Sequence, residues 1–316
     1  MIVERKEQQE NVTNKIAAHY DGLINVSRSN SIIYDLKRLN NWLKCCLVYS
    51  AALNFKQQRV LDLCCGKGGD LQKWRNLNVS YLAAVDIAPQ CVEECKFRYS
   101  KLKEKHPSKP MYDFECHVLD LGTEKLESCL ESNEKFDIVS CQFGIHYLFE
   151  SKEKINNFLQ NISQYSKKGS VFVLTLPNSN KLMSKLREAP GCSFGNSLYS
   201  VEFERDVKKI APKLFGEKYH FKLGDEVDLP EYLVYFKLLE ALLKSFNFHK
   251  CLRMSFSDFM EESLSRSESF FAETLRSMNG LSILSEYKDN AKLQHLEDFV
   301  ASGSLSSKRF VVLLMK

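Results

Sequence analysis

The sequence has no run of apolar residues approaching the roughly 20 that a membrane-spanning helix needs. It also has little excess charge of either sign, because 44 Lys and Arg residues stand against 40 Asp and Glu residues, a formal net charge of +4. The first residues, MIVERKEQQENV, carry charges where a secretory signal peptide needs an apolar core. We therefore expect a soluble intracellular chain without a membrane partner, in which any surface for nucleic acid depends on local clustering of basic residues.

The usual cysteine patterns of metal sites and disulfide frameworks are also missing. The 11 cysteines are odd in number, scattered, and never spaced as CxxC. This distribution argues against a zinc site and favours reduced thiols. Internal repeats and low-complexity segments are absent from the sequence, and 44% apolar and 27% charged residues are typical of a globular protein. The 316 residues are enough for one large domain with its own core.

Short apolar segments alternate with helical ones between residues 59 and 177. The predicted strands are RVLDL, YLAAVDI, FECHVLDL, FDIVSCQF and VFVLTLP, and the predicted helices include GDLQKWRNL, CVEECKFRYSKLKEK and residues 153–165. Nearly continuous apolar strands that alternate with helices are typical of a parallel sheet covered on both faces. The predicted fold class is therefore α/β, with a doubly wound, mostly parallel sheet. Ligands of such sheets bind beyond the carboxyl ends of the strands, where the strand order reverses.

The regions on either side of this core have a different texture. Residues 1–20 and 39–53 have helical patterns, whereas the segment after residue 177 is rich in aromatics and punctuated by glycines. Within that segment KYHFKL reads as a strand and EYLVYFKLLEALLKSF as an amphipathic helix. The final apolar segment, RFVVLLM, is predicted to be a strand that rejoins the sheet. We interpret residues 178–250 as a lobe inserted over the ligand-binding edge.

The stretch VLDLCCGKGGDLQKW, residues 60–74, places glycines directly after the first strand. A nucleoside-triphosphate loop needs Ser or Thr after its lysine, but Lys67 is followed by Gly68, and the GxGxxG spacing of a dinucleotide loop is also missing. A loop for S-adenosylmethionine needs only a close backbone approach to a ribose and a methionine tail. Asp86 and Asp120, after the next two strands, could accept hydrogen bonds from the ribose hydroxyls and the adenine amino group. The pattern favours S-adenosylmethionine, although both acids could instead cap helices and the glycines could form a turn without a ligand.

Beyond this loop the sequence resembles the mRNA cap guanine-N7 methyltransferases. Segments in the order of that family, over roughly residues 14–240, are KIAAHYDGL, LNNWLKCCL, VDIAPQCVEECKFRY, SCQFGIHYLFES, LTLPNSNKL, CSFGNSLYSVEF and KLFGEKYHFKLGDEVDLPEYLVYF. The HY near the start, NNWLK, QFxxHY and VDxPEYLVYF are specific to the family, whereas the glycine loop is generic. The resemblance implies one Rossmann-like class I methyltransferase domain. Its parts would be a helical lid (1–56), a donor-binding core (57–177), a cap-binding lobe (178–250) and a C-terminal segment with the last strand (251–316).

The resemblance also implies which residues form the site. Those that would line the S-adenosylmethionine pocket are Lys44, Cys64, Asp86, Asp120, Gln142 and Tyr147. Those that would line the cap pocket are Asn40, Asn41, Lys67, Lys73, Arg98, His146 and Glu231, with Phe310 or Arg309 where the family has a tyrosine that stacks on guanine. The family usually has glycine where Cys64 stands, and a side chain there excludes the most glycine-specific backbone angles.

The implied activity is transfer of a methyl group from S-adenosylmethionine to N7 of the terminal guanine of the GpppN cap, with S-adenosylhomocysteine as product and no metal. Because N7 has a free lone pair, alignment would suffice without an acid, base or nucleophile. The implied partners are 5′-capped RNA and the capping enzyme, the RNA polymerase II machinery or an activating subunit, for a monomer in the nucleus. Two alternatives stay open here: a methyltransferase for another substrate, and a catalytically silent module that binds the cap or RNA.

Overall fold

A seven-stranded sheet forms the centre of the protein, with strand order β10-β11-β5-β4-β1-β2-β3. The structure is a computed structural model that describes residues 2–22, 33–53, 55–56, 58–108, 110–224, 226–265 and 310–315. Strands β1 to β5 are parallel, and β11 lies antiparallel between β5 and β10. The predicted mostly parallel sheet and the rejoining last strand are therefore confirmed. The strands are β1 (Arg59–Leu63), β2 (Tyr81–Asp86), β3 (Asp113–Val118), β4 (Phe136–Gln142), β5 (Ser166–Leu176), β10 (Lys250–Ser255) and β11 (Phe310–Met315).

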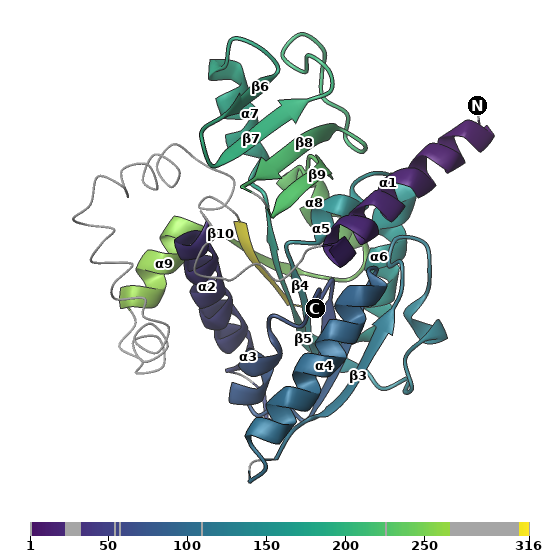
Figure 1. Cartoon of the computed structure of the whole chain (residues 1–316), viewed down its shortest axis with the longest axis vertical. Helices are drawn as coiled ribbons and strands as arrows, with labels where there is room; N and C mark the ends of the chain where they lie inside the picture. The colour runs from purple at the N-terminus through teal and green to yellow at the C-terminus, as the bar shows by residue number, and fades with distance from the viewer. Residues whose placement is uncertain are drawn as a thin grey trace.

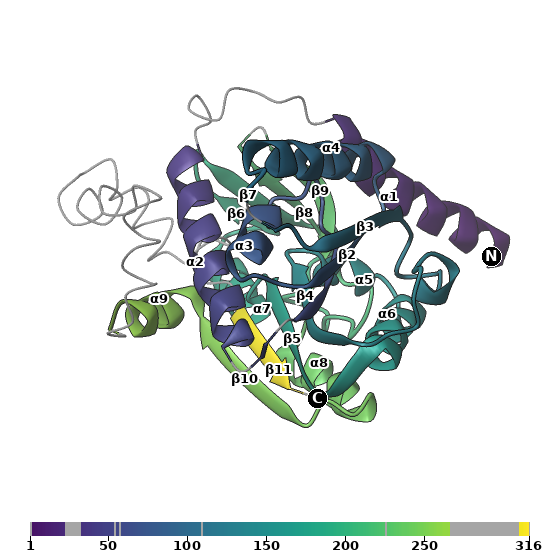
Figure 2. The ribbon, with the colours of Figure 1, turned by 90° about the horizontal axis from the view of Figure 1, so that it is seen from below.

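Helices cover both faces of this sheet, as Figure 2 shows from below. Side chains alternate along β1, so Val60 packs in an apolar cluster with Trp42 and Trp74, whereas Leu61 packs in a second cluster with Phe158. Among the described helices, none combines the length and apolarity that crossing a bilayer requires. The helices are α1 (Ile2–Gly22), α2 (Tyr34–Ala52), α3 (Leu71–Asn76), α4 (Pro89–Lys105), α5 (Ile145–Leu148), α6 (Lys152–Tyr165), α7 (Ser179–Glu188), α8 (Phe236–Ser245) and α9 (Phe256–Ser265).

The strand order reverses between β1 and β4. The chain passes from β1 to β2 and β3 on one side of the sheet, then returns to β4 and β5 on the other. The loops after β1 and β4 must therefore part in opposite directions, which leaves space between them for a ligand. Cys64 and Phe143 stand at these two strand ends, and both have a left-handed backbone, with φ of 55° and 61°.

A second, antiparallel sheet lies beyond the central one, at the top of Figure 1. Its strands are β6 (Ser193–Gly195), β7 (Tyr199–Phe203), β8 (Lys218–Leu223) and β9 (Val227–Tyr232). Apolar side chains of β7, β8 and β9 alternate toward α7, where Val201, Phe221 and Leu182 share one core cluster. The predicted strand KYHFKL is confirmed as β8.

The helix predicted over EYLVYFKLLEALLKSF begins later than its apolar periodicity indicated. Glu231 and Tyr232 are in β9, where Tyr232 pairs with Lys218, and α8 begins only at Phe236. Inter-strand hydrogen bonds therefore override the helical pattern of the first residues. Leu239 of α8 then packs in the core cluster of the central sheet rather than in that of the second sheet.

Candidate active site

A cavity of about 780 Å³ opens where the strand order reverses. Its walls include the loops after β1, β2, β3 and β4, parts of α1, α2, α4 and α5, and β8 and β9 of the second sheet. The structure thus brings together residues that are far apart in the sequence. The predicted residues that line it are Asn40, Asn41, Lys44, Cys64, Lys67, Asp86, Arg98, Asp120, Gln142, His146, Tyr147 and Glu231.

The glycine loop is fixed to the neighbouring strand by hydrogen bonds. The Gly66 N–H donates to Asp86 Oδ2 at 2.7 Å, and the Cys65 N–H donates to the Val85 carbonyl at 3.1 Å. Gly66 and Gly68 have φ of 52° and 71°, a region that glycine adopts without a steric penalty. The loop therefore presents its backbone to the cavity.

Cys64 adopts a left-handed backbone at the position where the resemblance implies glycine. For a residue with a side chain this conformation costs about 1–2 kcal/mol. The Cys64 side chain also leaves room only for glycine at position 144, because a Cβ built on Gly144 would lie 2.5 Å from Cys64 Cβ and 2.6 Å from Cys64 Sγ. The loops after β1 and β4 are thus packed against each other at the cavity wall.

Asp86 and Asp120 line the cavity and also stabilise their own turns. Asp86 Oδ1 accepts from the Ala88 N–H at 2.9 Å, and Asp120 Oδ1 accepts from the Gly122 N–H at 2.9 Å. Burial raises the pKa of Asp86, although the amides of Ala88 and Gly66 act to lower it. Neither acid caps a helix as weighed in the alternative, because the N-cap of α4 is Ala88 and a turn follows Asp120. Both carboxylates can still accept from a ligand, since each oxygen has two lone pairs.

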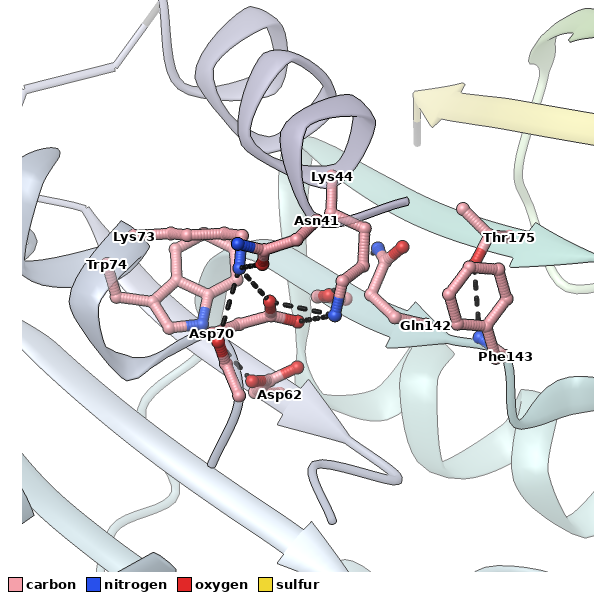
Figure 3. A network of polar contacts seen from close by, with 11 residues as sticks. Asn41, Lys44, Asp62, Asp70, Lys73, Trp74, Gln142, Phe143 and Thr175 are labelled. Carbon is pink, nitrogen blue, oxygen red and sulfur yellow. Dashed lines mark hydrogen bonds and ion pairs between the residues drawn. The ribbon is translucent and has the colours of Figure 1, made fainter. Parts of the chain in front are cut away.

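Lys73 is the exception among the predicted residues whose side chains the structure describes, because its side chain is buried and does not line the cavity. Its Nζ donates to Asp70 Oδ1 at 2.6 Å and to Asn41 Oδ1 at 2.5 Å (Figure 3). Lys44 Nζ lies 2.9 Å from the same Asp70 oxygen. The direct contact between Lys73 and the cap stays a prediction; in this structure Lys73 contacts Asn41, which does line the cavity.

Electrostatics hold this network together. Burial acts to raise the pKa of Asp70, but the ammonium groups of Lys44 and Lys73 outweigh it and hold that pKa below its usual range. Beneath it, Asp62 accepts from Trp74 Nε1 at 3.1 Å. Burial, with the negative charge of Asp70, raises the pKa of Asp62 to about 7. Two lysines and two carboxylates thus form one coupled unit under the cavity.

Several buried polar atoms at the cavity have no hydrogen-bond partner among the residues that the structure describes. They are Asn40 Oδ1, Gln142 Oε1 and both ring nitrogens of His146. Gln142 Nε2 donates to Ser140 Oγ at 3.2 Å, which fixes the amide and leaves its oxygen without a partner among the described residues. Buried polar atoms are seldom left without partners, and these four are therefore suited to bind a polar ligand.

His146 and Glu231 meet on the side of the cavity formed by the second sheet. His146 Nε2 lies 3.3 Å from Glu231 Oε1, a close approach without hydrogen-bond alignment, and both side chains are almost fully buried. The Tyr219 hydroxyl donates to Glu231 Oε2 at 2.7 Å, which fixes the carboxylate. Next to His146, the Tyr147 hydroxyl lies 2.9 Å from that of Tyr20 on α1. Burial raises the pKa of Tyr147, and its electrostatic interaction with Tyr20 acts in the same direction.

A model of the mRNA (guanine-N(7))-methyltransferase domain matches residues 3–300. The chain belongs to this family. The mRNA cap guanine-N(7) methyltransferase 1 of Arabidopsis thaliana is 34% identical over 285 residues, which cover 87% of this chain and 75% of that protein. The mRNA cap guanine-N(7) methyltransferase of Drosophila melanogaster is 32% identical over 305 residues, which cover 91% and 70%. The resemblance inferred from the sequence motifs is confirmed.

Solved structures agree with this fold at much lower sequence identity. The CcbJ methyltransferase of Streptomyces caelestis has a TM-score of 0.52 and 12% identity, with 95% of each chain covered. A putative S-adenosylmethionine-dependent methyltransferase of Listeria monocytogenes has a TM-score of 0.50 and 12% identity, covering 89% of this chain and 98% of that one. The cap methyltransferase fold is therefore that of class I S-adenosylmethionine-dependent methyltransferases.

The cap methyltransferase cavity also contains polar residues that the sequence argument did not select. Lys37 and Arg38 line it from α2, and Lys37 forms an ion pair with Glu226. Lys37, Asn41 and Lys44 are spaced i, i+4 and i+7, so they share one face of α2 opposite its buried apolar side chains. That polar stripe is the signal that could have identified Lys37. The two candidates for the stacking position remain open, since Arg309 and the side chain of Phe310 lie outside the described residues.

Proposed function

We propose that this chain transfers the methyl group of S-adenosylmethionine to N7 of the terminal guanine of the GpppN cap of mRNA. The observation that carries the proposal is one cavity that contains both the fixed glycine loop and the His146–Glu231 pair. Membership of the family supports the same reaction. S-adenosylhomocysteine would be the product, and the reaction needs no metal.

The donor half of the cavity would bind S-adenosylmethionine through Lys44, Cys64, Asp86, Asp120, Gln142 and Tyr147. Asp86 would accept from the ribose hydroxyls and Asp120 from the adenine amino group, since both acids face the cavity at successive strand ends. The free oxygen of Gln142 offers a further acceptor. When bound, the donor supplies the reactive group, a methyl group on a positively charged sulfur.

The acceptor half would bind guanine through Glu231 and His146. Guanine has N1–H and N2–H₂ donors on its Watson–Crick edge, and the buried Glu231 carboxylate can accept from them. His146 or an asparagine amide could donate to O6. Adenine has an acceptor at N1 and would leave the carboxylate unpaired, which costs on the order of 10³-fold or more in specificity.

The triphosphate would meet cations at the edge of the glycine loop after β1, which we call the donor loop because it would bind the methyl donor. Lys67 lies in the loop itself, and Arg98 on α4 lines the same cavity while donating to Glu94 at 2.7 Å. Asn40 and Asn41 come from the facing helix, α2. We assign direct contacts to these four residues and an orienting role to Lys73.

We infer that alignment alone drives the transfer, without a general acid, base or nucleophile. Guanine N7 carries a free lone pair at neutral pH, so no proton has to be removed before it attacks the methyl carbon. Holding two reactants in line can lower a barrier by roughly 7–11 kcal/mol. The rigid loop after β1 and the fixed Glu231 are suited to that task.

The four-part division into lid (1–56), core (57–177), cap lobe (178–250) and C-terminal segment (251–316) is part of this proposal. So are a nuclear location, 5′-capped RNA as partner, a monomeric state, and association with the capping enzyme, the RNA polymerase II machinery or an activating subunit. The contact of α1 with the cavity through Tyr20 supports the lid.

The reaction is tested with labelled S-adenosylmethionine and either GpppA-capped or triphosphate-ended RNA, followed by digestion and identification of the labelled nucleoside. We expect label in 7-methylguanine, from capped RNA alone. Label elsewhere would identify a different methyltransferase, and cap binding without transfer would identify a silent module.

The guanine assignment is tested with Glu231→Gln, which keeps the shape of the side chain but removes its charge. Losing charge-assisted hydrogen bonds of about 1.5–3 kcal/mol each should lower kcat/KM for capped RNA by about 100-fold or more. The KM for S-adenosylmethionine should change little. Glu202→Gln, at an exposed position of β7 in the same sheet, is the matched control. Unchanged cap kinetics in Glu231→Gln would refute the assignment.

A further inference from the structure

Three cysteines from separate parts of the sequence meet behind the donor loop. Cys65 is in the loop after β1, Cys95 is on α4 and Cys116 is on β3. Their sulfur atoms all lie within 4.8 Å of one another. Cys95 and Cys116 are buried, whereas Cys65 is half-buried and lines the cavity. The proposed methyl transfer gives these sulfur atoms no task.

We propose that Cys65, Cys95 and Cys116 form a binding site for a thiophilic divalent ion, Zn²⁺ or Cd²⁺, which inhibits methyl transfer. Each thiol would lose its proton to solvent as its sulfur binds the ion. Sulfur ligands suit such soft ions, and a fourth position would be open to water on the cavity side, where Cys65 lies. The ion would be an inhibitor of this enzyme and not a cofactor.

Charge favours a divalent over a monovalent ion at this place. Three thiolates with a divalent ion leave one net negative charge, whereas Cu⁺ would leave two. The carboxylates of Asp86 and Asp62 act electrostatically on Cys65 and Cys95, so each further negative charge in this buried region is costly. On charge alone, the site therefore favours Zn²⁺ or Cd²⁺ over Cu⁺.

Binding would displace the donor loop. Zinc–sulfur bonds of about 2.3 Å in a tetrahedral site place the sulfur atoms about 3.8 Å apart, so atoms up to 4.8 Å apart must approach by up to about 1 Å. The donor loop would move with the sulfur atoms because Cys95 Sγ packs closely against Gly68: a Cβ built on Gly68 would lie 2.7 Å from that sulfur. The Gly68 N–H also donates to the Cys65 carbonyl at 3.1 Å. A displacement of about 1 Å near a reacting centre can slow a reaction about 100-fold.

Binding is tested on the full, reduced chain by titration with Cd²⁺, followed through the ultraviolet charge-transfer absorption of cadmium–thiolate bonds. We expect one ion per chain in the wild type and loss of that absorption in Cys116→Ser, whose side chain is outside the cavity. Cys95→Ser provides a second variant if Cys116→Ser fails to fold. Cys192→Ser, in the second sheet region, should bind like the wild type.

Inhibition is tested separately by methyl transfer in the presence of Zn²⁺. The wild type and Cys192→Ser should lose activity by about 10- to 100-fold and recover it with a chelator, whereas Cys116→Ser should be resistant. Equal Cd²⁺ affinity in Cys116→Ser and the wild type would overturn the site. Cd²⁺ binding without Zn²⁺ inhibition would overturn its connection to the loop. Because metal binding has its own optical signal, a failure of the proposed methyl transfer would not be mistaken for a failure of the site.

Discussion

Replacing Lys73 by methionine distinguishes a structural role from a role in cap binding. The change removes the ammonium group but keeps most of the side-chain volume. It leaves the buried Asp70 carboxylate with Lys44 as its ion-pair partner among the described residues. Breaking a buried pair in this way costs about 3–5 kcal/mol, and we expect the lower value because Lys44 remains. At an unfolding entropy of roughly 0.7 kcal/mol per kelvin for a chain of this length, Tm should fall by about 5 °C.

The assay compares Lys73→Met with Lys67→Met, a matched substitution six positions earlier in the same loop and helix. Thermal unfolding followed by circular dichroism should show the loss of Tm in Lys73→Met, whereas Lys67→Met should stay near the wild type. Steady-state kinetics should show the reverse order, with KM for capped RNA raised about 10-fold or more in Lys67→Met. A Lys73→Met protein with wild-type Tm and a raised cap KM would refute the reasoning.

Two further predictions concern the residues beneath and beside the donor loop. Because the folded-state pKa of Asp62 is raised to about 7, its favourable contribution to stability is lost as pH rises from the unfolded pKa near 4 through that value. The Tm of Asp62→Asn minus that of the wild type should therefore grow more positive from about pH 5 to about pH 8, and a constant difference would contradict the burial argument. In the loop after β4, Gly144→Ala should raise the KM for S-adenosylmethionine about 10-fold or more, because its Cβ meets Cys64 of the donor loop. Adding Cys64→Gly should restore it, since the nearest remaining atom, Cys141 Sγ, is 3.3 Å away; no rescue would show that the contact is unimportant.

The central sheet was predictable because its strands are buried on both faces. Runs such as RVLDL and VFVLTLP have one interpretation when both faces are apolar, and the order of strands and helices then requires a parallel sheet. The start of α8 was not predictable, because residues 231–235 are as apolar as the helix that follows. Pairing between β8 and β9 fixes residues 231 and 232 as strand, and that contact is not local in the sequence.

The structure places predicted residues at the cavity where a strand end determines their position. Asp86, Asp120 and Gln142 follow or end strands of the central sheet, so the topology alone brings them to one edge. Lys73 differs because it is on α3, where a rotation of about 100° per residue decides which way a side chain points. Its pairing with Asp70 and Asn41 depends on the packing of α2, which sequence spacing does not reveal.

The position of β11 has a consequence for synthesis on the ribosome. This strand separates β5 from β10, so neither can complete its hydrogen bonding until residue 315 has been made. A nascent chain that already has the donor loop would still present the open edge of β5, with alternating valines, to other chains. Its survival during translation would thus depend on chaperones that bind exposed strands, and premature termination in this region should yield aggregates rather than a partly active enzyme.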